Sequence, residues 1–286
     1  MSHGKPLPIL LIGIFGLFVL AMAGAFVSAS GAFSSHAPAA ATNVADLSTS
    51  TPTPTQPPPP TPTPTPAGPP SFAQTRLWVG GDSLAAYLCE NLVPDARAKG
   101  VAFADQQWTI SSGLSRPDFF DWLATLQKAV DTDHPNVMVF MAGANDAQGL
   151  TTPSGQAVSV TPFDETWTAE YTKRVDQAMD ILGGNGRLAI WVGMPVMQSP
   201  SFDANMQKLN AIDKAEAAKH PRVIYVDPNV VLAPGGAFSL DLPGPDGTPV
   251  RVRAEDGVHL TSAGGELLAQ HVLKTLEATM PGGVQP

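Results

Sequence analysis

Two kinds of apolar pattern alternate along residues 72–280. Short, mostly apolar runs bounded by Gly and Pro predict buried strands, and longer segments with apolar residues at every third or fourth position predict helices. The predicted strands are residues 76–79, 107–110, 137–141, 188–192 and 223–226, and the predicted helices are residues 84–99, 118–130, 165–182, 203–219 and 262–278. Because parallel strands buried on both faces are apolar throughout, this alternation predicts an α/β fold, a three-layer α/β/α sandwich with a central parallel sheet of about five strands.

Two segments interrupt this alternation. Residues 147–163 contain the turn Pro153-Ser154-Gly155, after which Val158 and Val160 alternate with polar residues. Residues 238–242 and 249–253 flank a turn rich in Pro and Gly, which predicts a hairpin. Each segment lies next to a motif described below, so both either border a substrate cleft or form plain surface hairpins.

The N-terminal part of the chain differs in composition from this domain. Residues 9–27 form an uncharged apolar run that, at about 1.5 Å per residue, just crosses a bilayer core of about 30 Å. Lys5 precedes the run and the next Lys or Arg is Arg76, so residues 1–8 are expected to be cytoplasmic and the later residues outside. The run is either an uncleaved transmembrane anchor or a signal peptide cleaved after Ala29. The first alternative gives a cell-membrane protein with an extracytoplasmic domain, and the second a secreted or periplasmic protein.

Residues 28–71 are rich in Pro and Thr and poor in large apolar side chains. Because such a segment cannot bury a core, it predicts a disordered linker, either a semi-rigid polyproline II tether or a flexible or glycosylated stalk. Residues 281–286 are expected to form a flexible tail, which leaves residues 72–280 as the globular domain.

Charge and composition argue against several classes of function. The net charge is −9 and the few basic residues are scattered, which disfavours nucleic acid or an anionic lipid surface as a partner. The one cysteine, Cys89, cannot form an internal disulfide and is expected to be buried. Neither a metal nor another cofactor is expected, because there is no Gly-rich nucleotide loop and no metal-ligand spacing among His134, His220 and His271.

Serine, aspartate and histidine occur in an order that suggests a hydrolase. Ser83 lies between an apolar strand and a helix, which places its hydroxyl at the edge of the sheet and its N–H at a helix N-terminus. A serine hydroxyl is a weak nucleophile until a base takes its proton. His259 supplies that base, and Asp256 supplies a carboxylate to orient it. These residues predict a serine hydrolase.

Two more motifs follow predicted strands and carry groups suited to an oxyanion. Gly113 allows a backbone N–H to approach a substrate oxygen closely, and the side chain of Asn145 donates a second hydrogen bond. Because parallel strands end at the same edge of a sheet, these groups are expected to converge. The four blocks are Gly80-Gly81-Asp82-Ser83-Leu84, Ser111-Ser112-Gly113-Leu114, Gly143-Ala144-Asn145-Asp146 and Asp256-Gly257-Val258-His259.

In this order, over residues 76–276, the four blocks resemble the SGNH (GDSL) hydrolase superfamily. Residues 114–122 also resemble a bacterial branch of it that acts on cell-envelope material. The resemblance implies a flavodoxin-like fold with Ser83 as nucleophile, His259 as base and Asp256 as its partner. It also implies an oxyanion hole made of the N–H groups of Ser83 and Gly113 and the Asn145 side chain.

The resemblance implies a serine esterase that hydrolyses short-chain, acetyl-type O-esters on cell-envelope carbohydrate. The same residues would serve an O-acyltransferase that passes the acyl group to an envelope glycan. A non-catalytic envelope-binding domain is a further alternative, against which the intact blocks argue. The expected partners are an acylated carbohydrate or another small ester, and the membrane through the N-terminal helix.

The sequence also suggests roles for four residues outside the predicted catalytic set: Asp82, Asp146, Trp191 and Arg116. Asp82 and Asp146 are expected to make structural hydrogen bonds to adjacent loops, and Trp191 is expected in the core. Arg116 either contacts an anionic or sugar-ring substrate or pairs with Asp118 or Asp121.

Overall fold

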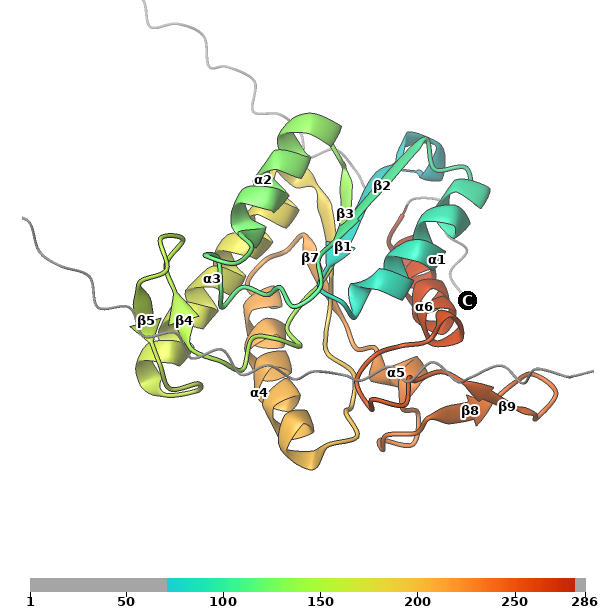
Figure 1. Ribbon diagram of the computed structural model, residues 1–286. Coiled ribbons are helices and arrows are strands. Elements are labelled where there is room, and N and C mark those ends of the chain that lie inside the picture. The colour runs from blue at the N-terminus through green and yellow to red at the C-terminus, as the bar shows by residue number, and fades with distance from the viewer. Residues whose placement is uncertain (1–70, 281–286) are drawn as a thin grey trace, which may run out of the picture. The chain divides into compact units, whose positions relative to one another are not determined.

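A five-stranded parallel sheet forms the centre of the computed structural model, which describes residues 71–280 (Figure 1). The strand order is β2-β1-β3-β6-β7, so the sheet grows outward on both sides of β1. This arrangement confirms the predicted α/β fold with a flavodoxin-like sheet. The strands are β1 (Arg76–Gly81), β2 (Phe103–Trp108), β3 (Val137–Met141), β6 (Leu188–Val192) and β7 (Val223–Val226).

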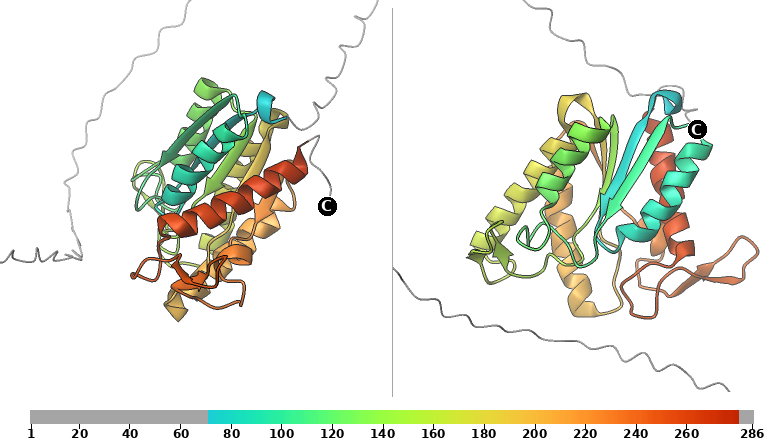
Figure 2. Two further views of the ribbon diagram at one scale, coloured as in Figure 1. Left: turned by 90° about the vertical axis from the view of Figure 1, so that its right-hand side faces the viewer. Right: turned by 45° about the horizontal axis from the view of Figure 1, so that its top comes forward.

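Helices cover both faces of this sheet. Helices α1 (Ala85–Ala98) and α6 (Ser262–Thr279) pack together on one face. On the other face α3 (Glu165–Gly183) packs between α2 (Trp122–Asp133) and α4 (Pro200–Ala217), as the right-hand view of Figure 2 shows. Three layers result, as the apolar pattern predicts.

Short elements fill the connections between these helices and strands. Two antiparallel hairpins, β4–β5 and β8–β9, lie in the two segments where the sequence predicts a break in the alternation. The remaining elements are η1 (Phe72–Gln74), β4 (Leu150–Thr151), β5 (Ala157–Ser159), η2 (Gly184–Gly186), α5 (Asn229–Leu232), β8 (Asp241–Pro243) and β9 (Pro249–Arg251).

The core lies on both faces of the sheet. All residues of β3 and β6 are buried, as are all residues of β1 except Arg76. Trp122, Phe140 and Trp191 continue this core in edge-to-face contacts, with ring centroids 5.1 and 5.2 Å apart. Trp191 therefore lies in the core, as predicted. Cys89 is also buried, and burial raises the pKa of its thiol to about 12, so the thiol stays protonated and unreactive at neutral pH.

Three predicted elements start at residues that differ clearly from those in the structure. Strand β2 begins earlier, at Phe103, because it is an edge strand with mostly exposed polar residues that show no apolar run. Helix α2 begins later, at Trp122, because the Asp121 side chain accepts a hydrogen bond from the N–H of Ala124 (3.0 Å) and caps the helix there. Helix α4 begins earlier, at Pro200, after the N-cap Ser199.

Helices α1 and α6 approach closely through glycine. A Cβ on Gly265 would lie 2.5 Å from Cβ of Tyr87, and one on Gly264 would lie 2.0 Å from the carbonyl oxygen of Val252. Larger residues at these two positions would force the helix away from its neighbours. The contact matters for the site because Ser83 lies just before α1 and His259 just before α6.

Among residues 71–280, no helix is both long enough and apolar enough to span a membrane. Residues 1–70 and 281–286 lie outside the described part of the chain. They hold the predicted cytoplasmic segment, anchor or signal peptide, nearly all of the linker, and the tail.

Candidate active site

Ser83, His259 and Asp256 form a continuous hydrogen-bonded chain. Nε2 of His259 lies 2.9 Å from Oγ of Ser83, and Nδ1 of His259 lies 2.7 Å from Oδ2 of Asp256. Ser83 occupies the turn between β1 and α1, and the other two residues lie in the turn before α6. The structure thus brings together three side chains that the sequence separates by up to 176 residues.

The turn that carries His259 is shaped around the Asp256 carboxylate. Oδ1 of Asp256 accepts hydrogen bonds from the backbone N–H groups of Val258 (2.8 Å) and His259 (2.9 Å). Gly257 adopts φ 72°, a left-handed conformation that glycine tolerates. Partial burial opposes ionisation of Asp256, but its bonds from the His259 ring and from these backbone groups outweigh burial and lower its pKa. Asp256 is therefore a carboxylate that can hold the imidazole in one orientation.

The loops after β1, β2 and β3 are joined at the same edge of the sheet. The N–H of Thr109 donates to the carbonyl oxygen of Gly81 (3.0 Å), which links the first two loops. Nδ2 of Asn145 donates to the carbonyl oxygen of Ser112 (2.9 Å), which links the second and third. The predicted site residues Asn145 and Gly113 therefore lie in loops that are tied to the one that carries Ser83.

The backbone N–H groups of Ser83 and Gly113 are candidate donors to a ligand oxygen. Within the part of the chain that the structure describes, neither group donates a hydrogen bond to the protein. Nδ2 of Asn145 carries two hydrogens and uses one of them on Ser112. These three groups match the predicted oxyanion donors in chemistry.

Asp82 ties the loop of Ser83 to the loop of Asn145. Its carboxylate accepts hydrogen bonds from the N–H of Leu84 (2.8 Å) and from those of Gly143 and Ala144 (both 3.0 Å). Burial raises the pKa of Asp82 to about 6, although these bonds act against the shift. Its role is structural, as expected from the sequence.

Arg116 is paired within its own loop. Its guanidinium donates two hydrogen bonds to the carboxylate of Asp118, at 2.9 and 2.8 Å, and this pair holds the pKa of Asp118 well below its usual range. Asp118 also accepts a hydrogen bond from the hydroxyl of Thr151 in hairpin β4–β5. Of the two alternatives for Arg116, the structure shows the ion pair.

A cavity of about 250 Å³ lies beside Gly113. Thr152 and Pro153 of the β4–β5 segment form part of its wall, so this hairpin borders a cavity next to a candidate site residue. The remaining walls come from α2, α3 and the loop after β2, through Leu114, Pro117, Asp121, Trp122, Leu123, Glu170, Arg174 and Gln177.

Two buried polar residues near the site, Tyr171 and Arg174, lie outside the four sequence blocks. Both lie on the buried face of α3, where Tyr171 donates to the carboxylate of Asp146 (3.0 Å) and Arg174 donates to the carbonyl oxygen of Leu114 (2.8 Å). An arginine on the apolar face of a predicted helix was the available signal, because charged side chains are seldom buried without partners.

One group of possible metal ligands occurs among residues 71–280: Asp176, Glu216 and His220. Sequence spacing did not reveal it because its members come from α3, from α4 and from the turn that follows α4. Its side chains already have protein partners, since Lys219 pairs with Glu216 (2.5 Å) and Nε2 of His220 lies 3.0 Å from Oδ1 of Asp176. It shares no residue with the chain of Ser83, His259 and Asp256, and we assign no metal to it.

Comparison with known proteins identifies the family and the fold. A family model described as "Protein of unknown function (DUF459)" matches residues 76–275, and no curated protein matches the chain in sequence. A proposed acylhydrolase from Bacteroides fragilis superposes with a TM-score of 0.51 and 16% identity, over 73% of this chain and 90% of that protein. LAE5, an α/β hydrolase enzyme from the metagenome of Lake Arreo, superposes with a TM-score of 0.51 and 18% identity, over 71% of this chain and 95% of that protein. A proposed SGNH hydrolase from Slackia heliotrinireducens superposes with a TM-score of 0.48 and 17% identity, over 71% of this chain and 98% of that protein.

Likeness at these identities concerns the fold. It confirms the fold that the resemblance to SGNH hydrolases implies.

Proposed function

The chain belongs to the DUF459 family of proteins of unknown function, and we propose that this member is a serine esterase whose nucleophile is Ser83. The observation that carries the proposal is the hydrogen-bonded chain from Ser83 through His259 to Asp256. This arrangement is the one that general-base activation of a serine requires.

The proposed reaction proceeds through an acyl-enzyme. Oγ of Ser83 attacks the ester carbonyl while Nε2 of His259 takes the hydroxyl proton, and Asp256 stabilises the resulting imidazolium. The carbonyl oxygen becomes an oxyanion, which accepts hydrogen bonds from the N–H groups of Ser83 and Gly113 and from the Asn145 side chain. His259 returns the proton to the departing alcohol. Water, activated by the same base, then releases the acid.

The exposure of the site favours an ester on a bulky alcohol. The side chains of His259 and Asp256 are 42% and 50% exposed, so the base lies at the surface rather than at the bottom of a tunnel. A polymer can reach such a site without entering the protein. We therefore propose short-chain O-esters on cell-envelope carbohydrate as the substrate class, in keeping with the export predicted from residues 9–27.

Hydrolysis of p-nitrophenyl esters of increasing acyl length, by the full chain, tests the esterase function. Acetate should be cleaved with the highest kcat/KM, and no cleavage of any of these esters would contradict the proposal. Product analysis with isolated envelope glycan, with and without an added acceptor sugar, then tests the substrate class. Free acetate in both mixtures indicates an esterase, whereas acetylated acceptor would indicate an acyltransferase that uses the same residues.

The pH profile should show the loss of one proton from the free enzyme on its acidic side. His259 must be neutral to accept the Ser83 proton, so kcat/KM should rise with pH and then level off. Asp256 adds no second step at acidic pH because its pKa is lowered and it remains a carboxylate. The measurement is kcat/KM for p-nitrophenyl acetate between about pH 4 and 9, corrected for spontaneous hydrolysis. An acidic limb with a slope of two, in a plot of log(kcat/KM) against pH, would contradict the assignment of Asp256 as a carboxylate.

The proposed location of the domain is outside the cytoplasmic membrane. Its support is the apolar run at residues 9–27, which Lys5 precedes, and the Pro/Thr-rich segment that follows. Protease added to intact spheroplasts should therefore cut within residues 28–71 and release a resistant domain. A fragment that stays in the membrane would indicate an uncleaved anchor. Protection of the domain until the membrane is lysed would show the opposite orientation.

A further inference from the structure

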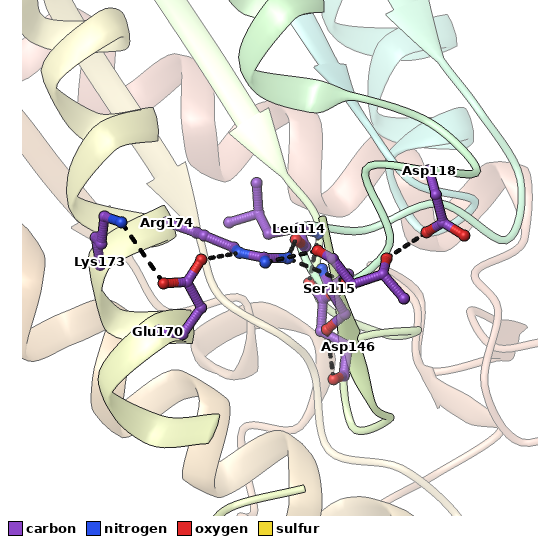
Figure 3. A network of polar contacts seen from close by, with 8 residues as sticks. Leu114, Ser115, Asp118, Asp146, Glu170, Lys173 and Arg174 are labelled. Atoms are coloured by element: carbon purple, nitrogen blue, oxygen red, sulfur yellow. Dashed lines mark hydrogen bonds and ion pairs between the residues drawn. The ribbon is translucent and has the colours of Figure 1, made fainter. Parts of the chain in front are cut away.

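Arg174 is a buried arginine that donates two of its four hydrogen bonds to the backbone of the loop that carries Gly113. Its side chain is 7% exposed, and it extends from α3 toward that loop (Figure 3). Nη1 donates to the carbonyl oxygens of Leu114 (2.8 Å) and Ser115 (3.1 Å), and Nη2 donates to that of Thr151 (2.7 Å). Nε donates to Glu170 (2.9 Å). A buried charge is costly unless it is satisfied in this way, so the arginine is specifically matched to this backbone.

Asp146 holds the same short segment through its N–H groups. Its carboxylate accepts hydrogen bonds from the N–H of Leu114 (3.1 Å) and of Ser115 (2.7 Å), and from the hydroxyl of Tyr171 (3.0 Å). The hydroxyl of Ser115 donates in turn to the carbonyl oxygen of Asp146 (2.7 Å). The peptide groups that follow Gly113 are therefore fixed through both their donors and their acceptors.

The peptide group that contains the N–H of Gly113 is fixed from its other end. Its carbonyl oxygen belongs to Ser112 and accepts the hydrogen bond from Asn145. A Cβ on Gly113 would lie 2.2 Å from Oδ1 of Asp146, so only glycine fits against this carboxylate. Because the N–H of Gly113 has no protein partner among the described residues, its direction depends on these neighbouring bonds.

We propose that Arg174 is a positioning residue, which holds Leu114 and Ser115 so that the N–H of Gly113 points at the oxyanion. This inference rests on the proposed esterase function. Asp146 and Tyr171 hold the N–H groups of the same segment, and we call Arg174, Asp146 and Tyr171 together the clamp. Through Thr151, the clamp also attaches hairpin β4–β5 to this loop.

The clamp should act on the transition state more than on bound substrate. Charge develops on the carbonyl oxygen only as Ser83 attacks, and an aligned N–H is worth most at that point. Removal of a whole oxyanion donor costs about 10²–10³ in kcat, so a misaligned donor should cost about 10-fold or more. KM should change little, since the ground-state ester gains little from the same N–H.

Arg174→Lys tests the proposal because lysine keeps the charge but cannot span the two loops. Arg76→Lys is the matched control, since Arg76 also donates to backbone carbonyl oxygens, those of Asp133 and His134, but at the opposite end of β1. The measurements are kcat and KM for p-nitrophenyl acetate, Ki for a trifluoromethyl ketone whose adduct carries an oxyanion, and Tm. Arg174→Lys should lower kcat by about 10-fold or more, raise Ki in parallel and leave KM within about 2-fold. Arg76→Lys should leave kcat and Ki unchanged.

Tyr171→Phe provides a second test that keeps the aromatic ring and removes only the hydrogen bond to Asp146. Like Arg174→Lys, it should lower kcat and raise Ki, but by a smaller factor. If Arg174→Lys does not fold, Tyr171→Phe is the variant that tests the proposal. Unchanged kcat and Ki in a folded variant would overturn the proposal. So would a fall in kcat with no rise in Ki. If the unaltered chain cleaves no ester and Ser83 takes no fluorophosphonate, the esterase function itself is wrong, and this inference is overturned with it.

Discussion

Ser83→Ala should lower kcat for p-nitrophenyl acetate by roughly 10⁶-fold and abolish covalent labelling by a fluorophosphonate. Alanine has no oxygen for His259 to deprotonate, so the acyl-enzyme cannot form. The Oγ–Nε2 distance of 2.9 Å makes Ser83 the serine that this base serves. The measurements are steady-state kinetics and mass spectrometry of the labelled peptide.

His259→Ala should cost about as much as Ser83→Ala, and the double variant should be no worse than either, because the two residues act as one unit. Ser201→Ala is a suitable control, since this exposed serine lies in the first turn of α4. It should keep full activity and labelling. Labelling of a serine other than Ser83, or additive losses in the double variant, would contradict the assignment.

Asn145→Ala should lower kcat by about 10²–10³-fold, equivalent to about 2.7–4 kcal/mol of lost transition-state stabilisation. Two effects contribute. The substitution removes a donor to the oxyanion, and it also removes the hydrogen bond that holds the carbonyl oxygen of Ser112 and thus the adjacent N–H of Gly113. Steady-state kinetics should show the loss in kcat, with KM nearly unchanged.

Asn136→Ala is the matched control for Asn145→Ala. Asn136 also bonds to backbone, through the N–H of Arg76 (2.8 Å) and the carbonyl oxygen of Gln74 (2.7 Å), but at the opposite end of the sheet. Its replacement should lower Tm and leave kcat unchanged. An Asn145 variant with normal turnover would remove that side chain from the mechanism.

The sequence predicted the parts of the fold whose signals are local. Strands β3, β6 and β7 occupy the predicted residues because each is an apolar run with clear ends. The predicted residues of strand β2 were wrong because β2 is an edge strand with exposed residues and has no apolar run. Its pairing with β1 defines its position. The start of α2 depends on one capping side chain, which a periodic pattern does not reveal.

The same distinction applies to the candidate site. The blocks that hold the candidate residues Ser83, Gly113, Asn145, Asp256 and His259 could be recognised in the sequence because each follows a strand or precedes a helix. Tyr171 and Arg174 could not be recognised in this way, because their partners lie in loops far away in the sequence and only the folded chain brings them together.

The close approach of α1 and α6 has a consequence for when the proposed activity can arise during synthesis. A ribosome makes Ser83 early, but His259 is held beside it by a helix that extends to Thr279 and packs on α1 through Gly265. A nascent chain that has not yet released α6 holds a nucleophile without a placed base. The proposed hydrolase should therefore be inactive until α6 has been made and has packed on α1, and its activity should appear in a single step.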